Sequence, residues 1–142
     1  NEINEAVSSY FPTNNRSQWI EKQSNKILLD AYNANPSSMK VAIENFSQLN
    51  ENNKILFLGD MFELGESSEE EHKLIFSLTE KLNLEAYFIG EHFFKIKPEA
   101  STSFFKSFND LETFIENKNV TEKTVLIKGS RGMALERILN LI

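Results

Sequence analysis

The sequence predicts an open, mostly parallel α/β sheet with helices on both faces and an N-terminal hairpin. Short, almost wholly apolar runs such as KILFLG (residues 54–59) and TVLIK (residues 124–128) are typical of parallel strands that are buried on both faces. Segments with the apolar spacing of amphipathic helices alternate with these runs. The 142 residues are enough for one domain with a core of its own.

The N-terminal part is predicted to hold a linker and the hairpin. Residues 1–10 carry a weak helical pattern, and residues 11–15, which contain proline and two asparagines, break it. The chain begins with asparagine rather than methionine, so we expect a piece of a longer protein. The hairpin is expected to pair Trp19–Glu21 with Lys26–Leu29 around Ser24-Asn25.

The first long helix is predicted to begin at Pro36, with Asn35 as its cap. Proline suits the first helical position because the N–H that it lacks would have no partner there. Apolar residues then recur at helical spacing and predict one buried face, formed by Met39, Ala42, Ile43, Phe46 and Leu49.

Further strands and helices are predicted to alternate along the rest of the chain. The strands are expected at Lys54–Gly59, Glu85–Gly90, Ser103–Lys106 and Thr124–Lys128. Two capping boxes, Ser67 with Glu70 and Asn109 with Glu112, predict where two helices begin. The first of these helices is expected to carry the apolar residues Leu74, Ile75, Leu78 and Leu82, and the second Leu111, Phe114 and Ile115. A final helix that reaches the chain end is expected to carry Leu135, Ile138, Leu139 and Ile142. Between Gly90 and Pro98 we expect a polar segment with His92 facing solvent.

Composition and charge exclude several classes of protein. The net charge of −6 argues against a broad nucleic-acid surface, which needs clustered lysine and arginine. The chain has no cysteine, so disulfides and thiolate metal sites are excluded, and its two histidines do not predict a metal site. No apolar stretch approaches the roughly 20 residues of a membrane span, and a cytoplasmic protein is expected.

Polar residues gather where the predicted strands end, which is where open α/β sheets bind ligands. After the first parallel strand the candidates are Asp30, Tyr32, Asn33 and Asn35. After the second they are Asp60 and Glu63, and after the last they are Lys128, Ser130 and Arg131. The segment DAYNANPSSM also has a purely structural interpretation, in which Asn33 stabilises a turn and Asn35 caps a helix. That interpretation leaves Asp30 and Tyr32 unexplained, so we favour a binding site.

Two other segments are open to both interpretations. KGSRGM (residues 128–133) precedes a predicted helix, where free N–H groups and the helix dipole favour an anion, and Arg131 can bind a carboxylate or phosphate with two nitrogens. It is not a Walker P-loop, a motif that occurs nowhere in the 142 residues. His72 follows an acidic run in the first turn of its predicted helix, and it is either a surface residue or part of the site.

Four strings in this order and spacing, NNRSQ, LLDAYNANPSSM, LGDMFELGESSEEEH and VLIKGSRGM, resemble the C-terminal domain of the Mur ligases, and most closely the MurF type. The resemblance covers the chain from about Tyr10 onward. It implies a Rossmann-like domain at residues 11–142, with residues 1–10 as the tail of a preceding ATPase domain. Many relatives have Asp-Ser or Asp-Asp-Ser before Tyr-Asn-Ala-Asn, whereas this chain has Leu29-Asp30-Ala31.

The resemblance also implies a function. Such enzymes are monomeric, cytoplasmic bacterial ligases that use ATP and Mg²⁺ to join D-alanyl-D-alanine to UDP-N-acetylmuramoyl-tripeptide through an acyl phosphate, in peptidoglycan synthesis. By matched position, Arg16 and Asp30 would meet the nucleotide, and no catalytic residue or metal ligand is expected in this domain. The residues matching the rim that holds the dipeptide are Tyr32, Asn33, Asn35, Asp60, Glu63, His72, Lys128, Ser130 and Arg131.

In this interpretation, Lys128 and Arg131 would bind the carboxylate of the dipeptide, and Asp60 or Glu63 its ammonium group. The P-loop and the Mg²⁺ ligands would belong to other domains, so the chain alone is expected to be inactive. Two alternatives remain: a receiver-type phosphoacceptor domain, because Asp60 and Lys128 imitate its aspartate and lysine, and another ligase of this fold such as folylpolyglutamate synthase.

Overall fold

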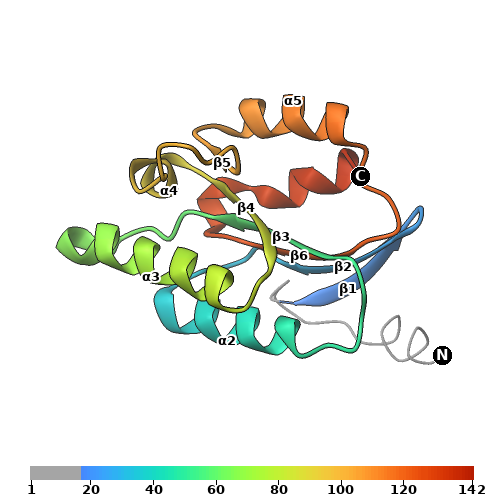
Figure 1. The fold of residues 1–142 in the computed structure, drawn as a ribbon, viewed down its shortest axis with the longest axis horizontal. Helices are drawn as coiled ribbons and strands as arrows, with labels where there is room; N and C mark the ends of the chain where they lie inside the picture. Colours follow the sequence, from blue (N-terminus) through green and yellow to red (C-terminus); the bar gives the residue numbers. More distant parts are fainter. Residues whose placement is uncertain (1–16) are drawn as a thin grey trace.

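The computed structural model describes residues 17–142, which form a six-stranded sheet covered on both faces (Figure 1). The strand order is β1-β2-β6-β3-β4-β5, and every neighbouring pair is parallel except β1 and β2. The strands are β1 (Gln18–Lys22), β2 (Asn25–Asp30), β3 (Lys54–Gly59), β4 (Glu85–Ile89), β5 (Phe104–Phe105) and β6 (Thr124–Lys128). The predicted open α/β sheet and its hairpin are confirmed.

The hairpin turn is tied to the segment that enters β6. Asn25 is buried, its side-chain nitrogen donates to the carbonyl of Val120 (3.1 Å), and its Oδ1 accepts from the N–H of Lys123 (2.9 Å). The Ser24 hydroxyl accepts from the N–H of Glu122 (2.8 Å). These bonds satisfy backbone groups of the segment before β6 and help to fix the register of β2 against β6.

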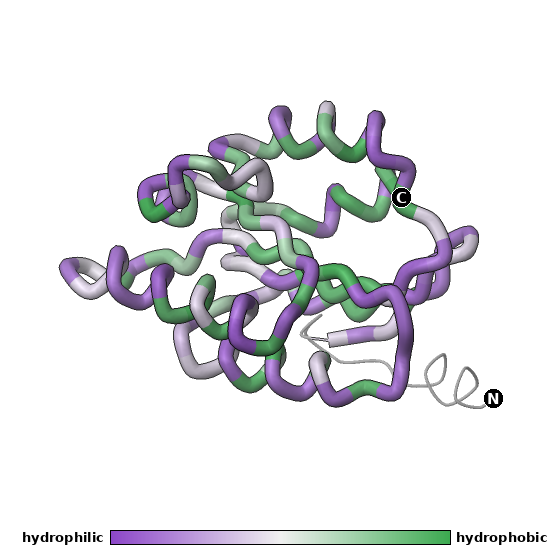
Figure 2. Tube along the Cα trace, viewed as in Figure 1, coloured by the Kyte–Doolittle hydropathy of each residue, from purple (hydrophilic) through white to green (hydrophobic). Residues whose placement is uncertain are grey.

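Helices cover the two faces of the sheet. The helical segments are α2 (Pro36–Ser47), η1 (Gly65–Ser67), α3 (Ser68–Lys81), α4 (Glu91–Lys95), α5 (Phe108–Lys118), η2 (Arg131–Met133) and η3 (Leu135–Asn140). In Figure 1, α2 and α3 lie on one side of the sheet, and α5 and the C-terminal segment lie on the other. Figure 2 shows that hydrophobic residues concentrate in the central strands between these layers.

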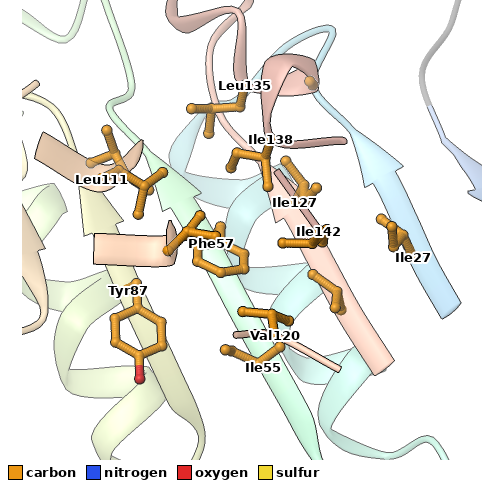
Figure 3. Packing of buried hydrophobic residues seen from close by; sticks show 14 residues of the cluster. Ile27, Ile55, Phe57, Tyr87, Leu111, Val120, Ile127, Leu135, Ile138 and Ile142 are labelled. Atoms are coloured by element: carbon orange, nitrogen blue, oxygen red, sulfur yellow. The ribbon is translucent and has the colours of Figure 1, made fainter. Parts of the chain in front are cut away.

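Alternation along the central strands builds two cores. In β3, Ile55 and Phe57 belong to the core beneath α5 and η3, and Leu56 and Leu58 belong to the core beneath α2, α3 and α4. Figure 3 shows the first core, in which Phe57 lies among side chains of β4, α5 and the C-terminal segment. Each side of the sheet is therefore stabilised by its own apolar cluster.

The start of α2 was predicted correctly, and the two capping boxes were not. Asn35 has an extended backbone and accepts the N–H of Ser38 (2.9 Å). Ser67 has a helical backbone because the 3₁₀ turn η1 runs straight into α3, so its hydroxyl donates to the carbonyl of Leu64 instead. Ser107, not Asn109, caps α5 and accepts the N–H of Asp110 (3.2 Å).

Three further predictions need correction. On the predicted face of α3, Ile75, Leu78 and Leu82 contact the core, but Leu74 is 53% exposed, and His72 and Thr79 are buried as well. The expected polar segment after Gly90 contains the helix α4, which buries Phe93. The final helix is two 3₁₀ segments, since Ala134 takes a left-handed conformation (φ 52°) between them.

The predictions for residues 1–15 lie outside the described part of the chain. Within residues 17–142, no helix is long and apolar enough to cross a membrane.

Candidate functional site

Hydrogen bonds join the segments that follow β3 and β6 at the carboxyl edge of the sheet. The N–H of Ser130 donates to the carbonyl of Asp60 (3.1 Å), and the Ser130 hydroxyl accepts the N–H of Phe62 (3.1 Å). The two backbones come so close that a Cβ at Gly129 would lie 3.0 Å from the Cα of Gly59. A glycine is needed there for this close approach.

Lys128 is paired inside the protein. Its side chain is 3% exposed, and the ammonium group donates to the carboxylate of Asp30 (2.9 Å) and to the carbonyl of Asn33 (3.1 Å). This buried pair fastens the segment after β2 to the end of β6. In this arrangement the Lys128 ammonium group already has two partners within the protein, and its contact with a ligand carboxylate stays a prediction.

The carboxylate of Asp60 is likewise occupied. It is buried and accepts the backbone N–H groups of His92 and Phe93, both at 2.9 Å, and so caps the first turn of α4. Gly90 permits this contact, because a Cβ there would lie 2.2 Å from the Asp60 Cγ. The expectation that Asp60 binds an ammonium group, and the receiver interpretation, which needs an accessible aspartate, both disagree with this burial.

His72 is buried, not on the surface. Its Nε2 accepts the N–H of Met61 (3.1 Å), and its Nδ1 donates to the carbonyl of Ser68 (2.7 Å). Its ring stacks on that of His92 (5.3 Å between centroids), which is half-buried instead of facing solvent. Burial lowers the pKa of His72, so the ring is neutral at neutral pH. A direct ligand contact is not available to it in this structure.

The two asparagines after β2 have the structural roles that a turn and a cap require. Asn33 Oδ1 accepts the N–H of Ala34 (2.9 Å), and Asn35 caps α2. The structural interpretation of DAYNANPSSM thus explains the positions of Asn33 and Asn35. The bond from Lys128 gives one carboxylate oxygen of Asp30, Oδ2, a partner within the protein.

Accessible polar groups remain around Arg131 and Tyr32. The guanidinium of Arg131 lies over the Tyr32 ring (5.2 Å to the centroid), and both residues line a pocket of about 370 Å³. The other residues that line this pocket are Gln18, Leu29, Ala31 and Glu136. Glu63, four residues after the end of β3, is exposed and has a left-handed backbone (φ 64°). The expected helix N-terminus after KGSRGM is wrong, since Arg131 begins only a three-residue 3₁₀ turn.

Asp30 and Lys128 also line a second groove, of about 450 Å³, on the α2 side of the sheet. Ser17 and Trp19 line it where the described chain begins. Arg16, the other predicted nucleotide contact, lies outside the described residues. Among the residues that are described, no group of three or more histidines, cysteines or acids is placed to hold a metal ion.

A family model described as "Mur ligase, glutamate ligase domain" matches residues 15–131. The chain belongs to this family. It is 33% identical over 133 residues to the UDP-N-acetylmuramoyl-tripeptide–D-alanyl-D-alanine ligase of Rickettsia prowazekii, covering 90% of this chain and 30% of the relative. It is 34% identical over 122 residues to the ligase of that name from Bacillus subtilis, covering 80% of this chain and 27% of the relative.

Solved structures agree with these relatives. A crystal structure of MurF from Acinetobacter baumannii matches 96% of this chain with a TM-score of 0.77 and 26% identity, over 31% of its own length. MurF ligase from Thermotoga maritima, in complex with ADP, matches 94% of this chain with a TM-score of 0.69 and 28% identity, over 31% of its own length. The recognition of a Mur ligase C-terminal domain of the MurF type is confirmed, and the chain spans about a third of its relatives.

Four residues that line the Arg131 pocket were not predicted as site residues, and two of them, Gln18 and Glu136, are polar. Gln18 lies in the edge strand β1, and Glu136 looks in sequence like an ordinary surface residue of a helix. Only the fold shows that β1 and η3 border the same cavity, so no local signal could have found them.

Proposed function

We propose that the chain is the C-terminal domain of an ATP-dependent ligase that joins D-alanyl-D-alanine to UDP-N-acetylmuramoyl-tripeptide in bacterial peptidoglycan synthesis. One observation carries the proposal: three of the four segments that resemble this family meet at one edge of the sheet, where Tyr32 and Arg131 border one pocket. The names of the relatives support it. The whole enzyme would activate the tripeptide carboxylate as an acyl phosphate, which the dipeptide amine attacks to form the amide.

The task of this domain would be to hold the dipeptide. A zwitterionic dipeptide needs a cation for its carboxylate and an acid near its ammonium group, and Arg131 and Glu136 supply these charges on the rim of one pocket. Glu63 is the second candidate acid, at the end of β3. Stacking on Tyr32 limits the rotamers of Arg131, which lowers the entropy cost of binding. A fixed amine would then be placed for attack, which is a large source of rate enhancement.

The nucleotide would lie at the other groove. Asp30 lines that groove, and the bond from Lys128 occupies its Oδ2, so Oδ1 is the oxygen that a ribose hydroxyl would approach. The side chain of Asp30 is 17% exposed, which suits a contact completed by a closing domain. Bound ATP with Mg²⁺ would supply the phosphoryl group, and Arg16 is proposed as the second nucleotide contact from this chain.

Other parts of the proposal concern the whole protein. Residues 1–10 are proposed as the tail of the preceding ATPase domain, and the complete enzyme is proposed to be a cytoplasmic monomer. Because the 142 residues contain no Walker P-loop, the chain alone is predicted to have no ligase activity.

The dipeptide role is tested by titrating the chain with D-alanyl-D-alanine and recording backbone amide shifts by NMR, with L-alanyl-L-alanine as the control ligand. Shifts selective for the D,D isomer are expected at Tyr32, at residues 129–136 and at Gln18. The full-length enzyme is then compared with its Arg131→Ala and Glu136→Gln variants. Lys40→Ala is the charge-matched control, since Lys40 is exposed on α2 and lies outside the Arg131 pocket.

Loss of a charge-assisted bond to the dipeptide carboxylate should raise KM for the dipeptide by roughly 10- to 100-fold in Arg131→Ala, with little change in Lys40→Ala. Glu63→Gln distinguishes the two candidate acids. Full-length enzyme that binds dipeptide normally without Arg131 would refute the assignment of this pocket. Full-length enzyme that forms no amide from these substrates would refute the function itself.

A further inference from the structure

His72 and Ser130 each accept a backbone N–H of the segment after β3. The His72 Nε2 accepts the N–H of Met61 (3.1 Å), and the Ser130 hydroxyl accepts the N–H of the next residue, Phe62 (3.1 Å). Asp60 directly precedes them. Its carboxylate accepts the N–H groups of His92 and Phe93, and its carbonyl accepts the N–H of Ser130. Three consecutive residues are therefore fixed by side chains and backbone from three other elements.

The hydrogen bonds of His72 define its protonation state. A carbonyl can only accept, so the Nδ1 that faces the Ser68 carbonyl at 2.7 Å carries a proton. A backbone N–H can only donate, so the Nε2 that faces Met61 carries none. The bond to Met61 exists only with the neutral Nδ1–H tautomer of a side chain that is 0% exposed.

Some of the groups that pack against His72 favour its protonated form, and others disfavour it. Asp60, at the end of β3, lies 4.0 Å from Nε2 and favours the imidazolium, as does Glu71 on α3. His92 on α4, whose ring stacks on that of His72, disfavours it. Burial outweighs the bond to the Ser68 carbonyl and the two acids, and the pKa of His72 is lowered.

We propose that His72 is the positioning residue of the Asp60–Leu64 segment, through the bond from Met61, and that this bond is released when the imidazole is protonated. A proton on Nε2 would face the Met61 N–H, donor against donor, and would turn toward the Asp60 Oδ1 at 4.0 Å. The carboxylate would then be shared with the N–H groups of α4. Protonation thus loosens both the segment that carries Glu63 and the cap of α4.

The direct test follows the Met61 amide proton by NMR from about pH 8 to pH 5, together with the ring protons of His72. In the unaltered chain the Met61 amide is expected to move upfield with the same one-proton midpoint as the His72 ring, below about pH 6.5. In His72→Gln, an amide oxygen can take the place of Nε2 as acceptor, so the Met61 amide should keep its downfield position and stop titrating. His72→Leu, if folded, should show the upfield position at every pH.

His92→Gln is the matched control, because it removes the other histidine and leaves the bond to Met61 in place. The titration of the Met61 amide should persist in this variant. A Met61 amide that does not respond while the His72 ring titrates would overturn the proposal. So would a titration that survives in His72→Gln and disappears in His92→Gln.

The consequence for catalysis rests on the proposed function. In the full-length ligase, His72→Gln should keep KM for the dipeptide and flatten the acid limb of its pH profile, whereas His72→Leu should raise KM several-fold more than it lowers kcat. Full-length protein with no ligase activity would refute the proposed function and leave the NMR result standing. Active enzyme with an unchanged KM and pH profile in both variants would refute a role for His72 in the site.

Discussion

Replacing Gly90 with alanine tests the contact between the ends of β3 and β4. Gly90 has φ 127° and ψ 164°, a conformation that is essentially restricted to glycine. The added Cβ would lie 2.2 Å from Cγ and within 2.4 Å of both carboxylate oxygens of Asp60. Asp60 is buried and cannot move outward, so its carboxylate must leave the two N–H groups at the start of α4.

The expected cost follows from these two effects. The backbone conformation contributes about 1–3 kcal/mol, and each lost bond from a backbone N–H to a buried carboxylate about 1.5–3 kcal/mol. A total of about 5 kcal/mol is expected, which would lower the melting temperature by roughly 15 °C for a domain of this size. The free energy of unfolding is measured by urea denaturation of the chain, followed by circular dichroism.

Gly65→Ala is the matched control. Gly65 also has a positive φ (62°), but a Cβ there would meet no atom within 4 Å. It should cost only about 1–2 kcal/mol. Asp60→Ala combined with Gly90→Ala removes the colliding atoms, so the two changes together should cost about 2–3 kcal/mol less than the sum of the single changes. A Gly90→Ala variant no less stable than Gly65→Ala, or additive costs in the double variant, would refute the reasoning.

Three further outcomes can be measured on the same chain. Asn35→Ala should lower the free energy of unfolding by about 1 kcal/mol, because it removes the α2 cap, whereas Asn35→Asp should retain most of it. Asp30→Ala should cost about 3 kcal/mol, because it leaves the buried ammonium of Lys128 without its carboxylate, and adding Lys128→Met should restore part of that loss. Burial and the bond to Glu85 (2.6 Å) raise the pKa of Tyr87, so the free energy of unfolding should fall as the pH rises above about 10, and Tyr87→Phe should weaken that fall.

The sheet could be predicted from the sequence because its signals are local. A strand buried on both faces must be apolar throughout, and KILFLG and TVLIK satisfy this condition within β3 and β6. The hairpin and the start of α2 follow from equally local features, the turn between two short strands and the Asn35-Pro36 pair.

The capping errors show where local signals fail. Ser67 and Glu70 have the spacing of a capping box, but a cap needs an extended backbone, and the turn η1 places Ser67 in a helical one. Ser107 caps α5 because its backbone is extended (φ −134°, ψ 162°) as the chain leaves β5. That conformation depends on how the preceding segment packs, which residue identity does not determine.

The predicted site residues do lie at the carboxyl edge of the sheet, but which of their charged groups are already bonded within the protein could not be read from the sequence. Asp60 and Arg131 look equally available in sequence, yet Asp60 is 2% exposed and capped onto α4, while Arg131 is exposed. The partners of Asp60 are 32 and 33 residues away. Whether a polar group binds a ligand or the protein depends on such contacts, which only the folded chain defines.

The internal network has a consequence for how this edge can work. Because Asp60, Lys128, Ser130 and His72 are each bonded to other segments, the ends of β2, β3, β4 and β6 form one connected unit. A ligand at this edge then meets groups whose supports are already in place, so little ordering is required on binding. Under the proposed function, the exposed Arg131 and Glu136 would contact the ligand, while the buried groups would hold the surrounding segments in place. Substitutions of the exposed pair should therefore change affinity without changing stability, and substitutions of the buried groups should change both.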